Sequence, residues 1–115
     1  MDYVNCDKLI RISLPAVRIA VALELRDQYG MGQVGISKKL GVTQASVSKY
    51  LNGQYSSGIA KLSDTIKTAG LAGGLAKKVA AEKDAQAIRE LVSASAIDKQ
   101  VIEMAQKLFG KAAFE

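Results

Sequence analysis

Apolar side chains recur along this chain at three- and four-residue intervals, which is the period of an amphipathic α-helix. Val17, Val21 and Leu25 lie four residues apart and form one stripe of a predicted helix. Ile19 and Leu23 form a second stripe on another face, so both faces of this helix need a cover. The cover is either the C-terminal helices or a partner subunit. The alternating pattern typical of strands is nearly absent.

Helix-capping and helix-breaking residues divide this pattern into segments. The first helix is expected to begin at Ser13 as its N-cap, with Pro15 in its first turn, and to end at Gly30. Short helices are expected over residues 32–40 and from 43 or 44 to 51. A further helix is expected to cover residues 59–69.

The pattern continues beyond residue 70. The pair Gly73-Gly74 is expected to interrupt it before a short helix that ends near Glu82. Asp84 is a candidate N-cap for the next helix, and Ser95 with Asp98 has capping-box spacing before the last one. The chain is therefore predicted to be all-α, a bundle of five to seven helices. Residues 1–70 form one part and residues 71–115 a C-terminal helical extension.

Composition excludes most enzyme chemistry. The chain has no histidine and one cysteine, which removes imidazole-based acid–base catalysis, activated nucleophile pairs and nearly all common zinc sites. No glycine-rich phosphate cradle is recognisable. We therefore expect no enzyme activity, no metal site and no cofactor. A lone cysteine fits a reducing cytoplasm. The apolar stretch 14–25 contains Arg18 and Glu24 and is too short to span a membrane.

The most informative segment is residues 33–52, QVGISKKLGVTQASVSKYLN. It meets the physical needs of a helix-turn-helix, in which two short helices cross closely around a tight turn. Ser37 is the small residue at the close approach, and Gly41 tolerates the positive φ of the turn. Ile36 and Leu40 point inward from the first helix, and Val47 anchors the second.

The outward face of the second helix is polar or small. Glutamine hydrogen-bonds adenine, serine reads several bases, and alanine contacts the thymine methyl group. Residues further along the helix are better placed for phosphate. Thr43 is the expected N-cap and, with Ser46, a candidate DNA contact. Lys38 and Lys39 are candidate phosphate contacts. The outward set is Gln44, Ala45, Ser48, Lys49 and Asn52.

The charge distribution points to the same partner. The chain carries a net charge of +5, with 16 Lys and Arg against 11 Asp and Glu. Between Asp27 and Asp64 there is no acidic residue, although four lysines lie there. A basic segment around a helix that fits a groove is the electrostatic footprint expected for double-stranded DNA binding.

Residues 14–60 resemble the helix-turn-helix of phage-repressor-like (XRE-type) transcriptional regulators. The wider stretch, with the run LPAVR at 14–18 and GVTQASVSKYL at 41–51, is similar to predicted archaeal regulators. The resemblance implies a λ-repressor-like fold. It also implies that Gln33 braces the second helix and contacts phosphate, that Gln44 reads a base, and that Asn52 contacts the DNA backbone.

One short module makes few base contacts, so a homodimer on a palindromic site is expected. The extension contains more apolar residues than one short helix bundle is expected to bury, and these residues are the predicted dimer interface. In an alternative interpretation the extension is a protein-interaction module, or the antitoxin half of a toxin pair, and DNA binding serves autoregulation. A small-molecule sensor is a third possibility, although no cluster of polar residues in an apolar setting marks a pocket.

Overall fold

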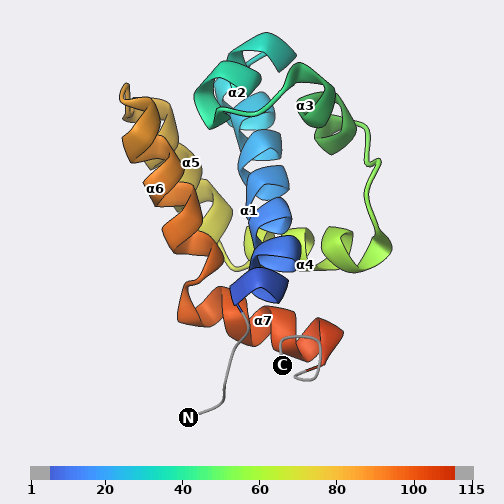
Figure 1. Cartoon of the computed structure of the whole chain (residues 1–115). Coiled ribbons are helices and arrows are strands. Elements are labelled where there is room, and N and C mark those ends of the chain that lie inside the picture. Colours follow the sequence, from blue (N-terminus) through green and yellow to red (C-terminus); the bar gives the residue numbers. More distant parts are fainter. Residues whose placement is uncertain (1–5, 111–115) are drawn as a thin grey trace.

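One long helix, α1 (Cys6–Tyr29), runs through the middle of the fold (Figure 1). The computed structural model describes residues 6–110. Within that range short turns join seven helices and no strand is present, which confirms the all-α prediction at its upper number of helices. The other helices are α2 (Gln33–Leu40), α3 (Gln44–Leu51), α4 (Ser57–Thr68), α5 (Leu71–Ala81), α6 (Ala85–Ala96) and α7 (Lys99–Phe109).

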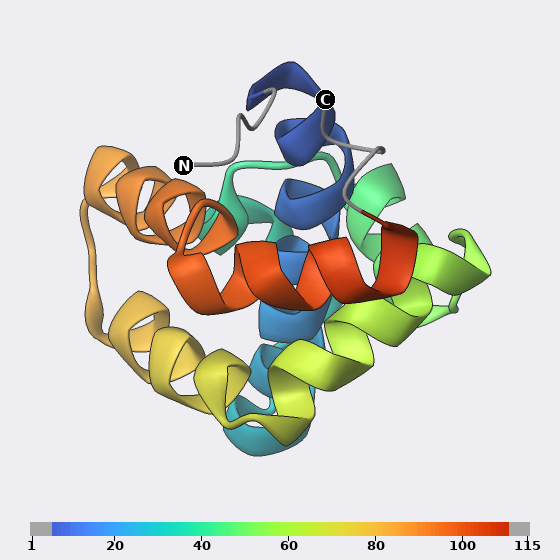
Figure 2. The ribbon, with the colours of Figure 1, turned by 90° about the horizontal axis from the view of Figure 1, so that it is seen from below.

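The central helix α1 is surrounded by the other six. Helices α2 and α3 lie at one end of it, α5 and α6 lie along its side, and α7 crosses the opposite end next to α4 (Figures 1 and 2). Ala16, Ala20 and Ala22 are fully buried in α1, and their short side chains let the neighbouring helices approach closely. The first apolar stripe is covered within the chain, because Val17, Val21 and Leu25 are at most 1% exposed. In the second stripe Ile19 is 1% exposed, whereas Leu23 is only half-buried.

The start of α1 differs from the expectation. The helix begins at Cys6, so Ser13 and Pro15 lie inside it rather than at its N-cap and first turn. Proline lacks an N–H and removes one helical hydrogen bond. Ile12 and Leu14 pack against the core next to the proline, and this apolar packing compensates for the loss.

The expected helix break at Gly73-Gly74 is also absent. Both glycines lie inside α5, which runs without a break from Leu71 to Ala81. Ala72, Ala76 and Val79 are buried on one face of this helix, and α5 packs against α1. This packing holds the helix together although each internal glycine weakens it.

The caps of the C-terminal helices agree in part with the sequence. Asp84 caps α6 by accepting a hydrogen bond from the Ala87 N–H at 2.9 Å, as predicted. The expected capping box of Ser95 with Asp98 is wrong. Asp98 is itself the N-cap of α7 and accepts a hydrogen bond from the Gln100 N–H at 2.9 Å, whereas Ser95 belongs to the last turn of α6.

Much of the apolar content of the extension lies inside the chain. Val79, Ile88, Val92 and Val101 are buried in the shared core, so the surplus expected for a partner subunit is smaller than the sequence suggested. The large apolar side chains left exposed after residue 70 are Ile97 and Leu108 within the described range. None of the helices between residues 6 and 110 has the length and apolar content needed to cross a membrane.

Candidate nucleic-acid interface

Helices α2 and α3 form a helix-turn-helix held from the inside by three apolar side chains. Ile36, Leu40 and Val47 are at most 5% exposed, as the pattern predicted. Gly41 ends α2 in the left-handed backbone conformation, with φ of 68°. Residues other than glycine rarely adopt this conformation. The turn is therefore fixed by the backbone and the core beneath it.

Ser37 has a second role that its size alone did not indicate. Its hydroxyl donates a hydrogen bond to the Val42 carbonyl at 2.7 Å, across the turn. Its own carbonyl accepts hydrogen bonds from the N–H groups of Gly41 and Val42 at 3.0 and 3.2 Å. The side chain thus closes the turn in addition to leaving room for the second helix.

The N-terminus of α3 is capped as predicted. Thr43 accepts a hydrogen bond from the Ser46 N–H at 3.1 Å through its side chain oxygen. The same hydroxyl donates to the Ser46 Oγ at 2.9 Å. Both hydroxyls are therefore engaged with each other in the first turn of α3.

Gln33, the first residue of α2, connects the two helices of the motif. Its Nε2 donates a hydrogen bond to the Gln44 carbonyl oxygen at 3.0 Å. Both glutamine side chains are otherwise exposed at the surface. This contact fixes the main chain of Gln44 and leaves the Gln44 side chain available for a ligand.

The outward face of α3 is polar and accessible. Gln44, Ala45 and Lys49 are exposed, and Ser48 is half-buried. Asn52 caps the C-terminal end of α3, because its Nδ2 donates to the Ser48 carbonyl at 2.9 Å and to the Ser48 Oγ at 3.3 Å. The predicted residues of this helix therefore lie on one surface, together with Gln33 and Thr43.

Two neighbouring lysines of α2 have different surroundings. Lys38 is exposed and, among the described residues, has no hydrogen bond or ion pair. The Nζ of Lys39 donates a hydrogen bond to the carbonyl oxygen of Glu82, at the C-terminal end of α5. Lys38 is thus free for a ligand, whereas Lys39 connects the motif to the extension.

Arg26 is a residue that sequence reasoning missed. Its Nη1 lies 3.5 Å from the Leu51 carbonyl oxygen at the end of α3, and its Nε donates to the Asp27 carboxylate at 2.7 Å. This hydrogen bond holds the pKa of the Asp27 carboxyl below its usual value and raises the pKa of Arg26. A regular position in α1 gave no sign of a partner 25 residues further along the chain.

The charged side chains of the helix-turn-helix surface are almost all positive. Residues 28–63 contain no acidic residue and supply α2, α3 and the first part of α4. Asp27, at the near end of this stretch, is paired with Arg26. Within residues 6–110 no group of three or more cysteine, aspartate or glutamate side chains is placed to hold a metal ion.

A helix-turn-helix family model matches residues 23–64, which run from the end of α1 into α4. No curated protein and no solved structure matches the chain. The match and the geometry together identify residues 23–64 as a helix-turn-helix segment, a motif typical of DNA-binding proteins. The likeness to archaeal regulators stays a prediction.

Proposed function

We propose that this protein is a sequence-specific, double-stranded DNA-binding regulator of transcription that acts as a homodimer in the cytoplasm. Helix α3 enters the major groove, where Gln44 and Ala45 contact base edges and Ser48 lies next to them. Lys38, Thr43, Ser46, Lys49 and Asn52 contact or face the DNA backbone, and Gln33 contacts phosphate beside them. The observation that carries the proposal is the exposed Gln44 side chain on a main chain fixed by Gln33.

The division of labour follows the chain. Residues 1–70 contain the DNA-binding part, and residues 71–115 form an extension that supports it and supplies the dimer contact. A recognition helix of eight residues reads only a short half-site. Two copies with recognition helices about 34 Å apart read a palindrome with far greater affinity. Exposed Ile97 and Leu108 of the extension are the apolar side chains available for that contact.

Selection from random DNA duplexes tests base readout. The wild type is compared with Gln44→Ala and with Gln100→Ala, which removes an exposed glutamine from α7 as a matched control. We expect the wild type and Gln100→Ala to enrich the same palindrome. Gln44→Ala should lose about 1–3 kcal/mol of discrimination at one position of each half-site.

The opposite outcome is equally clear. Weak binding of all three proteins, with steep salt dependence and no enriched sequence, would show that the basic surface acts only through phosphate attraction. That result would favour the alternative in which the extension is a protein-interaction module. Light scattering at micromolar concentration tests the dimer: a monomeric wild type contradicts it, and conversion of a dimer to a monomer by Leu108→Glu supports it.

A further inference from the structure

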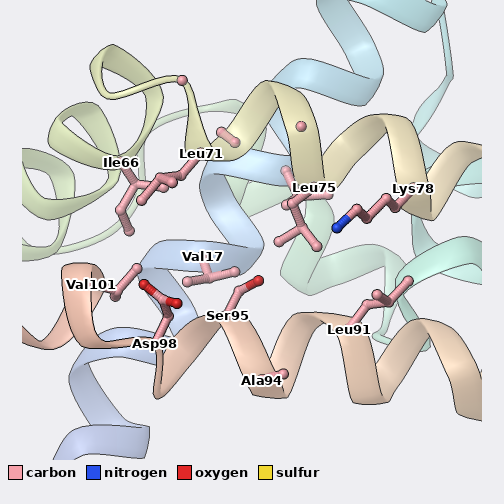
Figure 3. Close-up of a pocket in the computed structure, with 14 residues that line it drawn as sticks. Val17, Ile66, Leu71, Leu75, Lys78, Leu91, Ala94, Ser95, Asp98 and Val101 are labelled. Carbon is pink, nitrogen blue, oxygen red and sulfur yellow. The ribbon is translucent and has the colours of Figure 1, made fainter.

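A pocket lies between α5 and α6 (Figure 3). These two helices lie on the other side of α1 from α3 (Figure 1). Its volume is about 390 Å³, within the range of small-molecule sites. Val17 and Val21 of α1, Leu75 of α5 and Leu91 of α6 line it. The pocket could not be predicted from the sequence, because five helices contribute to its lining: α1, α4, α5, α6 and α7.

The pocket is open because its walls carry small residues. Gly74 of α5 and Ala94 of α6 both line it. A Cβ added at Gly74 would have no neighbour within 4 Å, and the backbone of Gly74 does not have a positive φ. Neither packing nor backbone geometry therefore requires glycine at this position, although glycine weakens a helix relative to alanine. The pocket is therefore empty because Gly74 and Ala94 are too small to fill it.

Three polar side chains lie at the pocket, and they differ in how far they are already engaged. The Asp98 carboxylate caps α7 through the Gln100 N–H. The Lys78 ammonium and the Ser95 hydroxyl have no hydrogen bond or ion pair among residues 6–110. In Figure 3 both are directed towards the pocket, and Asp98 lies at the end away from Lys78. The pocket thus offers one unpaired cation beside an apolar wall.

We infer that this pocket binds a small amphipathic monocarboxylate. Its apolar body packs on Val17 and Leu75, its carboxylate pairs with Lys78, and Ser95 donates a hydrogen bond to it. The negative charge of Asp98 disfavours a second carboxylate at the other end. This inference is independent of DNA binding, since none of these residues lies on the α3 surface.

Octanoate is a suitable probe, with 1-octanol as the neutral molecule of the same length. Binding is followed on the full chain, without DNA, by amide chemical shifts. We expect octanoate to bind more tightly than 1-octanol and to shift the signals of α5, α6 and Val17. Lys78 is itself exposed, so Lys78→Gln should weaken octanoate about two- to fivefold, the size of an exposed ion pair, and should leave 1-octanol unchanged. Lys77→Gln, at the exposed neighbouring position outside the pocket, should have no effect.

A second pair of variants tests the space itself. Ser95→Leu fills the pocket and should reduce octanoate binding more than tenfold, since it removes both the cavity and the hydroxyl. Ser93→Leu makes the same change at an exposed position of α6 and should bind normally. Equal affinity of octanoate and 1-octanol, or normal octanoate binding by Lys78→Gln and Ser95→Leu, would overturn the inference. Shifts that grow with protein concentration alone would instead assign the pocket to a second copy of the chain.

Discussion

Gly58 is a residue whose lack of a side chain determines how two distant segments meet. It lies in the first turn of α4, and a Cβ there would be 2.8 Å from the Cε1 and Cζ atoms of Phe109, the last residue of α7. Such a distance is shorter than carbon atoms tolerate without a shift. The ring of Phe109 therefore packs directly on the backbone of α4, and this contact anchors the end of α7. Helices α4 and α7 lie next to each other in Figure 2.

Gly58→Ala is expected to lower the free energy of unfolding by about 1 kcal/mol, because part of the Phe109 burial is lost. In a Phe109→Ala background the same substitution should instead stabilise the protein by up to about 1 kcal/mol, since only the higher helix propensity of alanine remains. Urea denaturation of the four proteins measures both values. A stabilising effect of Gly58→Ala in both backgrounds would contradict the packing argument.

At the scale of the elements, α2 has contacts on two sides. Gln33 fixes it to α3, and Lys39 fixes it to the C-terminal carbonyl of α5. The neighbouring Lys38 takes part in neither contact. Of these two adjacent lysines, Lys39 therefore stabilises the fold, and Lys38 is available for the proposed phosphate contact.

Lys39→Ala should lower the free energy of unfolding by about 1–2 kcal/mol, because the Glu82 carbonyl loses a charged donor. Lys38→Ala should change stability by less than about 0.5 kcal/mol. It should weaken DNA binding similarly for all sequences and reduce the slope of log affinity against log salt by about 1. Thermal unfolding and salt-dependent DNA titrations separate the two. Equal losses of stability in both variants would be inconsistent with the different surroundings of these lysines.

The element scale also shows what the sequence could predict. Local signals located the turn glycine Gly41, the caps Thr43 and Asp84, and the buried Val47, because each depends on neighbours a few residues away. The true start of α1 was missed, since packing of distant helices outweighs the local effect of Pro15. The pocket and the contacts of Arg26 and Lys39 could not be predicted, because their partners are brought together only by the tertiary fold. The DNA contacts of the α3 residues stay predictions.

At the scale of the whole molecule, α1 contacts every other described helix. Val21 and Leu25 are fully buried in one core cluster that also contains Val47 of α3 and Val92 of α6. The boundary near residue 70 is therefore a proposal about function. It is not expected to separate two units that unfold independently.

Unfolding in urea should be a single cooperative transition. We expect the native amide signals of Val47 and Val92 to disappear at the same urea midpoint, which should equal the midpoint from far-ultraviolet circular dichroism. The slope should be about 1–3 kcal/mol per molar urea, as for other small proteins. Loss of the Val92 signal at a clearly lower concentration than that of Val47 would show that the extension unfolds by itself.

The central position of α1 has a consequence during synthesis. This helix leaves the ribosome before all the helices that cover it, and α7 follows it by about 70 residues. At about 5–20 residues per second, the cover of its two apolar faces is complete only after on the order of ten seconds in each new chain. The growing polypeptide therefore presents an incompletely covered apolar helix during that time, which makes α1 the segment of this protein that chaperones are expected to bind on the ribosome.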